Sequence, residues 1–326
     1  MYEEAPNATT EDTTTVSSSS SSSPPARVVV KVLKADDAAA ECKWYGVLGR
    51  HPNIARLLKS SLQEPQPASN PSPSPSPSPS SPSQTATDDP PAPDDWGWIM
   101  LEALLHPDSE SCTLLSMAQR WAASGRTIHH DADMARLLLS GAQGLAHMHA
   151  CHVIHADVKM ENLLVDCGTM TAKWCDLTQA SAGPTTKPSG TPGLMAPEQV
   201  VRNVITRRFE VTFATDVWSF GIMLLEAYSN RDLDVLERSL LDIIMKLRSS
   251  ATYTSSRAAI QRYGPVLSDW YLEYHAGSPL VTLATKCLAA NPSDRPAMAA
   301  VVDSLREFVN EAAAAAAADA EPGART

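Results

Sequence analysis

The chain has 326 residues, of which 43% are hydrophobic, and it carries a formal net charge of −11. This length and this apolar fraction allow a large domain with a substantial core. An acidic balance disfavours sequence-independent binding to nucleic acid, which needs clustered Lys and Arg, so we expect no nucleic-acid partner.

Cysteine usage and hydropathy predict where the protein resides. Six cysteines are spread along the chain without a CxxC pair, a pattern typical of reduced thiols in an intracellular protein. The first 25 residues contain no basic stretch followed by an apolar run, and no apolar run approaches the roughly 18 residues of a membrane span. We therefore expect a cytoplasmic or nuclear protein without a membrane partner.

Three segments have too little apolar sequence to build a core. Residues 1–25 are rich in Ser, Thr and Pro, residues 63–94 contain a Pro-Ser repeat, and residues 311–326 form an alanine run with a polar tail. We expect disorder in the first two, because they cannot offset the entropy of ordering. The alanine run could extend a helix through propensity alone.

The remaining sequence predicts strands first and helices later. Residues 27–33 and 96–101 have the composition of strands, and residues 36–49 contain helix formers that end before Pro52. In residues 131–150, helical spacing places one set of side chains on a single face: Met134, Leu138, Ala142, Leu145 and His149. Two short strands, 162–165 and 172–175, and further helices follow, which predicts an α+β fold with a larger helical part.

Residues 153–165 carry the most informative motif. They read Val-Ile-His-Ala-Asp-Val-Lys-Met-Glu-Asn-Leu-Leu-Val, which resembles the protein kinase catalytic loop of His-Arg-Asp followed five residues later by Asn. The resemblance implies that Asp157 accepts the proton of the substrate hydroxyl and that Asn162 holds a magnesium ion. Lys159 would contact the transferred phosphate, as in serine/threonine-type kinases.

Fourteen residues after Asn162 stands Asp176-Leu177-Thr178. This triplet resembles the Asp-Phe-Gly motif of the family, which implies that Asp176 is a second magnesium ligand. Leu177 keeps an apolar side chain in place of Phe. Thr178 is a departure, because Thr lacks the backbone freedom of Gly where the activation segment pivots.

Three later motifs extend the resemblance. Residues 190–198 resemble the Gly-Thr…Ala-Pro-Glu segment, which implies that Thr191 bridges Asp157 and Lys159. Residues 216–221 resemble the start of the helix that anchors the catalytic loop. Arg295 matches the arginine that pairs with the glutamate of Ala-Pro-Glu, here Glu198.

The N-terminal part resembles a shortened nucleotide-binding lobe. Lys31 corresponds to the lysine that contacts the α- and β-phosphates, and Glu41 is its candidate partner on the following helix. Glu41 lies ten residues before His51 rather than about nine, so this pairing is expected to need an irregular turn. Residues 99–104 resemble the strand and hinge that receive adenine, with Leu101 as gatekeeper and with Glu102 and Leu104 at the hinge.

The resemblance therefore implies a bilobal protein kinase domain over residues 26–310. Its small lobe would span 26–102, with the insertion at 63–94, and its large lobe 103–310. The implied reaction transfers the γ-phosphate of ATP, with Mg²⁺, to a Ser or Thr hydroxyl of a protein substrate. A disordered Ser/Thr-rich tail at 1–25 and an Ala-rich tail at 311–326 would flank the domain.

Two features favour alternatives, namely the absence of a glycine-rich loop and Thr178 in place of Gly. The sequence has no glycine before Gly46, so the glycine-rich loop of the family is missing. A pseudokinase that serves as a binding scaffold would fit this pattern, as would an incomplete N-terminus. In addition, Ala156 replaces the arginine that often binds a phosphorylated activation segment. Activity is therefore expected not to depend on phosphorylation of the candidate sites Thr185, Thr186 and Ser189.

Overall fold

The computed structural model describes residues 28–61, 96–104, 112–124, 132–187, 189–191, 193–200, 209–229, 278–289 and 291–319. The segments expected to be disordered, 1–25 and 63–94, lie outside the described residues. The chain divides into two compact units. The first contains residues 1–43 and 56–103, and the second contains residues 44–55 and 104–326.

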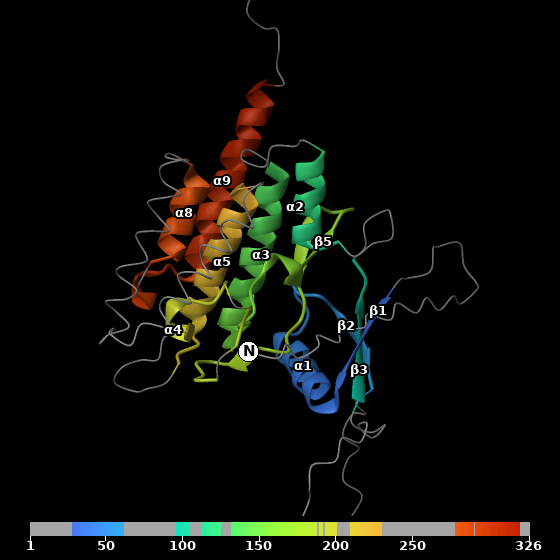
Figure 1. The fold of residues 1–326 in the computed structure, drawn as a ribbon. Coiled ribbons are helices and arrows are strands. Elements are labelled where there is room, and N and C mark those ends of the chain that lie inside the picture. The colour runs from blue at the N-terminus through green and yellow to red at the C-terminus, as the bar shows by residue number, and fades with distance from the viewer. Residues whose placement is uncertain are drawn as a thin grey trace, which may run out of the picture. The chain divides into compact units, whose positions relative to one another are not determined.

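The first unit is built on a three-stranded antiparallel sheet. Its strands are β1 (Val28–Lys34), β2 (Leu57–Ser60) and β3 (Trp96–Glu102), in the order β1-β3-β2 (Figure 1). Helix α1 (Ala35–Leu48) follows β1 directly. A Cβ atom on Gly97 would lie only 2.8 Å from the Cβ of Ala38, so the glycine permits the close approach of α1 to β3.

The strand and helix expected in residues 27–49 both form. Alternation along β3 buries Ile99 and Leu101 on one face of the sheet. Helix α1 ends at Leu48. Gly49 follows with a φ of 62°, the left-handed conformation common after a helix C-terminus, and its N–H donates to the carbonyl of Tyr45 at 3.0 Å. The division between the two units falls within this helix, because residues 44–55 belong to the second unit.

The second unit is mainly helical. Its described helices are α2 (Leu114–Ala123), α3 (Ala132–Ala150), α4 (Pro197–Val200), α5 (Phe213–Ser229), α8 (Pro279–Cys287) and α9 (Met298–Asp319). Helix α3 packs against α5 and α9, and α8 packs against both of those helices (Figure 1). The alanine run continues α9, as its propensity predicts. None of the helices in the described part of the chain is long and apolar enough to cross a membrane.

The predicted apolar face of α3 forms the centre of this unit. Met134, Leu138, Ala142 and Leu145 are each at most 1% exposed. Burial of this stripe is the main source of stability for such a helix, since propensity contributes little. The fifth predicted position, His149, instead makes a polar contact that belongs to the candidate site.

Two small two-stranded antiparallel sheets follow α3. One pairs β4 (Val153–Ile154) with β7 (Ser181–Ala182), and the other pairs β5 (Leu163–Asp166) with β6 (Thr171–Trp174). Trp174 is fully buried and donates its indole N–H to the carbonyl of Gly141 at 2.7 Å. A Cβ atom on Gly144 would lie 2.6 Å from the Trp174 ring, so glycine is needed there for the β5–β6 hairpin to pack on α3.

Candidate active site

In the first unit, Lys31 and Glu41 form an ion pair. The Lys31 Nζ atom lies 3.0 Å from the Glu41 Oε2 atom, and the Glu41 side chain is fully buried. The expectation that this pairing needs an irregular turn is wrong, because α1 is a regular helix from Ala35 to Leu48. The ten-residue spacing from Glu41 to His51 is taken up after the helix, where Gly49 turns the chain.

The predicted adenine-binding residues lie at and after the end of β3. Leu101 is 5% exposed. Glu102 pairs with Arg56 twice: its backbone N–H donates to the Arg56 carbonyl at 3.0 Å, and its Oε1 atom accepts from the Arg56 N–H at 2.8 Å. Leu104 begins the segment in the second unit, where its carbonyl accepts from the N–H of Cys112 at 3.5 Å.

In the second unit, Asp157, Lys159 and Thr191 meet although they come from two distant segments. The Thr191 hydroxyl donates to Asp157 Oδ1 at 2.7 Å, and the Lys159 ammonium lies 3.0 Å from Asp157 Oδ2. Lys159 also donates to the Thr191 hydroxyl at 3.1 Å. Asp157 is only 8% exposed. The charge-assisted hydrogen bonds from Thr191 and Lys159 hold its carboxylate in one orientation.

Asn162 is oriented by the same aspartate. Its Nδ2 atom donates to the Asp157 carbonyl at 2.9 Å and to Asp157 Oδ2 at 3.0 Å. The 3₁₀ turn η3 (Met160–Asn162) reverses the chain direction so that the Asn162 amide reaches Asp157. Because the nitrogen is directed at Asp157, the amide oxygen is the atom with which Asn162 could bind a cation.

The β5–β6 register brings Asp176 next to Asn162 along the backbone. Leu163 pairs with Trp174, and one step further the N–H of Cys175 donates to the Asn162 carbonyl at 3.0 Å. Asp176 follows with a φ of 58°, a left-handed conformation that turns the chain away from the strand. A carboxylate and an amide oxygen are ligands that Mg²⁺ prefers, so these residues fit a magnesium ion.

Thr178 makes a contact that the sequence analysis missed. Its hydroxyl donates to Asp176 Oδ1 at 2.6 Å, and its backbone N–H approaches the same oxygen at 3.4 Å. Thr178 is not at positive φ, so the replacement of Gly adds a hydrogen-bond donor rather than backbone strain. The only sequence signal for this contact is a hydroxyl residue two positions after an aspartate.

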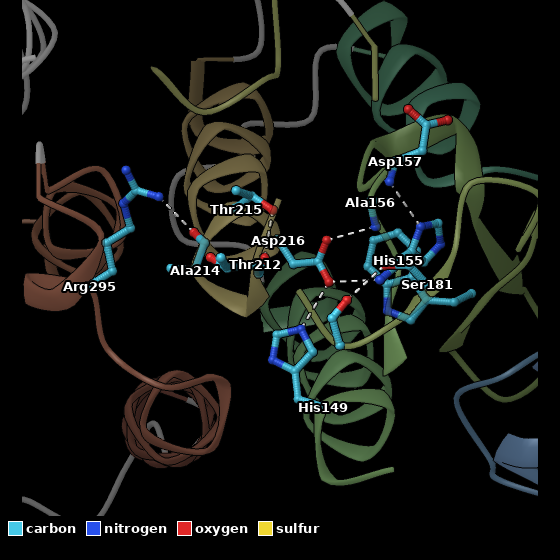
Figure 2. A network of polar contacts seen from close by, with 12 residues as sticks. His149, His155, Ala156, Asp157, Ser181, Thr212, Ala214, Thr215, Asp216 and Arg295 are labelled. Carbon is cyan, nitrogen blue, oxygen red and sulfur yellow. Dashed lines mark hydrogen bonds and ion pairs between the residues drawn. The ribbon is translucent and has the colours of Figure 1, made fainter. Parts of the chain in front are cut away.

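Asp216, at the start of α5, holds the backbone of the catalytic loop (Figure 2). Its carboxylate accepts from the backbone N–H groups of His155 at 2.8 Å and Ala156 at 2.9 Å. The His149 ring also donates to it at 2.9 Å, which explains the inward position of this residue on α3. The His155 ring in turn accepts from the N–H of Asp157 at 3.3 Å, so the network reaches the candidate base.

A buried ion pair contacts the start of α5, the helix that carries Asp216. Arg295 donates to both carboxylate oxygens of Glu198, at 2.6 and 2.9 Å, and its side chain is fully buried. It also donates to the carbonyls of Ala214 at 2.8 Å and Ala289 at 2.9 Å. The predicted pairing of Glu198 with Arg295 is confirmed as a contact, and it ties α4 to the start of α5.

The three candidate phosphorylation sites differ in exposure. Ser189 is only 9% exposed. The expectation that a modifying enzyme can reach it is therefore wrong. Its carbonyl accepts from the Gln199 side chain at 3.1 Å, which keeps this stretch against the rest of the unit. Thr186 is exposed, and Thr185 is partly buried in a bridge with Val211.

Comparison with protein-family models gives a match to "Protein kinase domain" over residues 93–305, which is more than half of the chain. The match covers the candidate base, both candidate metal ligands and the Glu198–Arg295 pair. Lys31 and Glu41 lie before the matched residues.

Among curated proteins, the chain is similar to several plant kinases. It is 32% identical over 188 residues to the probable serine/threonine-protein kinase PBL15 of Arabidopsis thaliana, covering 55% of this chain and 42% of that protein. It is 33% identical over 178 residues to the probable serine/threonine-protein kinase PBL8 of Arabidopsis thaliana, covering 52% and 42%. The alignments thus span less than half the length of these relatives. The matched domain and these similarities show that the chain belongs to the eukaryotic-type protein kinase family, with its serine/threonine-kinase members as relatives.

Proposed function

We propose that this chain binds ATP with Mg²⁺ and transfers the γ-phosphate to Ser or Thr hydroxyls of a protein substrate. The observation that carries this proposal is the position of Asp157 between Lys159 and Thr191. A general base must be held within hydrogen-bond reach of the proton that it accepts. Here the carboxylate is nearly buried, yet both of its oxygens are fixed by the flanking ammonium and hydroxyl groups.

In this proposal each residue has a separate task. Asp157 orients the substrate hydroxyl and accepts its proton. Lys159 places a positive charge where negative charge grows on the transferred group. Asn162 and Asp176 would hold the metal ion, which when bound neutralises charge on the phosphates.

In the first unit, the Lys31 ammonium is the group proposed to contact the α- and β-phosphates. Glu41 orients it through the 3.0 Å ion pair and stays buried beneath it. Adenine is proposed to bind along the chain from Leu101 to Leu104. These residues would therefore set nucleotide affinity, whereas Asp157 would set the rate of transfer.

A second candidate function, a pseudokinase that binds partners without turnover, is favoured by one specific observation. The Thr178 hydroxyl already occupies a lone pair of Asp176 Oδ1 at 2.6 Å. A metal ion would have to share that oxygen or displace the hydroxyl. Weak metal binding would then limit the transfer step even though the base is in place.

The test is a titration of the full chain with ATP in the presence and absence of magnesium, followed by transfer of radiolabelled γ-phosphate. The acceptors are two peptide libraries, one with Ser and Thr and one with Tyr. We expect magnesium-assisted binding and labelling of the Ser/Thr library only. Binding without labelling would support the pseudokinase, and labelling of the Tyr library would contradict the substrate class.

The control variants separate catalysis from folding. Asp157→Asn should bind nucleotide like the unaltered chain but lose transfer. Asp303→Asn, on the exposed surface of α9 where the side chain is 70% exposed, should change neither quantity.

A further inference from the structure

Two thiols that are distant in sequence, Cys112 and Cys167, touch within the second unit. Their Sγ atoms are 3.1 Å apart although 55 residues separate them. Cys112 is fully buried immediately before the N-cap of α2, and Cys167 is partly exposed in the turn that follows β5. The proposed phosphoryl transfer uses neither thiol.

The backbone around both thiols keeps the sulfur atoms adjacent. The N–H of Val165 donates to the carbonyl of Cys112 at 2.7 Å, and Thr113 and Leu164 form an antiparallel bridge. The segment that carries Cys112 thus runs alongside β5. The two sulfur atoms are close because Cys112 pairs with Val165, and Cys167 lies two residues after Val165.

The turn after β5 can accommodate a bond between the two sulfurs. A disulfide is about 2.05 Å long, so the sulfur atoms must approach by about 1 Å. Cys167 lies in the turn rather than in the β5–β6 ladder, and Gly168, which has no side chain to hinder an adjustment, follows it. Asp166 Oδ1 accepts from the N–H of Gly168 at 2.9 Å, which holds the turn together while the side chain of Cys167 adjusts.

The two thiols differ in reactivity. Burial, together with the hydrogen bond with Cys167, raises the pKa of Cys112 to about 12. Cys112 is therefore a protonated thiol, shielded from solvent. Cys167 is the sulfur that a dissolved oxidant can reach.

We propose that Cys112 and Cys167 form a reversible intramolecular disulfide when the protein meets hydrogen peroxide. The Cys167 sulfur attacks one peroxide oxygen, the O–O bond breaks, and the thiol proton leaves with the second oxygen as water. Cys167 is then a sulfenic acid. The Cys112 sulfur attacks the sulfenic sulfur, the S–O bond breaks, and the Cys112 proton leaves with the hydroxyl group as a second water.

In this sequence the two thiols lose two electrons and two protons, and the peroxide is reduced to two waters. A dithiol reductant reverses it by thiol–disulfide exchange. The new bond joins the start of α2 to the end of β5, the strand that begins directly after Asn162. Because it closes a long loop, it should raise the thermal unfolding temperature of the oxidised protein by several degrees.

The experiment uses the full chain, purified with reductant, freed of it and treated with hydrogen peroxide. Remaining thiols are blocked, and the protein is digested with trypsin without reduction. Cleavage after Lys and Arg separates Cys112, in residues 60–120, from Cys167, in residues 160–173, and neither peptide contains another cysteine. We expect one cross-linked species of these two peptides, which disappears after treatment with dithiothreitol.

Two variants complete the test. Cys167→Ser should abolish the cross-link, whereas Cys151→Ser, which alters another partly exposed cysteine of the same unit, should leave it unchanged. A dominant cross-link between other cysteines, overoxidation of Cys167 without a cross-link, or no oxidation under excess peroxide would overturn the proposal. The peptide map of the unaltered chain suffices for this decision even if a variant fails to fold.

Discussion

The carboxylate of Asp216 accepts hydrogen bonds from the backbone N–H groups of both Ala156, at 2.9 Å, and its neighbour His155. Ala156 has a φ of 64°, the left-handed conformation that costs a residue with a Cβ atom about 1 kcal/mol or more. Asp216 therefore stabilises a strained turn one residue before the candidate base.

This relationship predicts that Asp216→Asn lowers both stability and activity. An Asn side chain has one acceptor oxygen, and its NH₂ group would face a backbone donor in a fully buried position. We expect the free energy of unfolding in urea to fall by about 2–4 kcal/mol. Asp303→Asn is the control and should change it by less than about 0.5 kcal/mol. Equal stability of the two variants would contradict the role of Asp216.

The second prediction concerns the base. Asp157→Asn should lower the rate of phosphoryl transfer by about 10²–10⁴ with little change in nucleotide affinity, because general-base catalysis acts on the transition state. The measurement is single-turnover transfer to the Ser/Thr peptide library. An unchanged rate in the purified variant would remove Asp157 from the reaction.

The third prediction tests the hydroxyl of Thr178. If its hydrogen bond to Asp176 competes with the metal, Thr178→Val should bind Mn²⁺ up to about tenfold more tightly in the presence of a non-hydrolysable ATP analogue. Thr178→Ser retains a hydroxyl and serves as the matched control. Electron paramagnetic resonance measures the free Mn²⁺. Weaker binding by the Val variant would instead show that the hydroxyl orients Asp176 for the metal.

The fourth prediction concerns the activation segment. Because Ala156 cannot bind a phosphate group, replacing the two candidates that are not buried, Thr185 and Thr186, with Ala should leave specific activity within about threefold. Ser189 is buried, so Ser189→Ala reports on packing rather than on phosphorylation and belongs in a separate variant. Complete loss of activity in the Thr185→Ala, Thr186→Ala double variant would refute the expectation.

The fifth prediction is a dependence of stability on pH. Burial lowers the pKa of His51 below 6.5, and His147, whose ring stacks on it with centroids 4.2 Å apart, lowers it further. As the pH falls below 6.5, the unfolded chain binds a proton that folded His51 resists, so this part of the stability is lost on acidification. Thermal unfolding between about pH 7.5 and 5.5 would show the decrease.

The control for this effect is His51→Asn. The Nδ1 atom of His51 accepts from the N–H of Asn53 at 3.2 Å, and an Asn side chain could keep that acceptor without titrating. We expect a shallower loss of unfolding temperature on acidification in this variant. An identical pH profile would assign the effect to other groups.

The sequence by itself was sufficient for the family and for most elements near the site. The apolar stripe of α3 and the β-branched residues of β1 reflect local periodicity, which a sequence displays directly. The catalytic loop could be recognised because Asp157 and Asn162 lie within one short segment. Their chemical roles, and those of Lys31 and Asp176, remain predictions.

Only the tertiary structure decided the contacts that no sequence motif had predicted. The regular course of α1, the burial of Ser189 and the contact between Cys112 and Cys167 depend on packing between segments. Periodicity reports which side of an element faces the core, but not which atom of another segment it meets there. Those contacts arise only when strands pair and helices pack, because hydrogen bonds form over about 3 Å and a shift of one residue changes every partner.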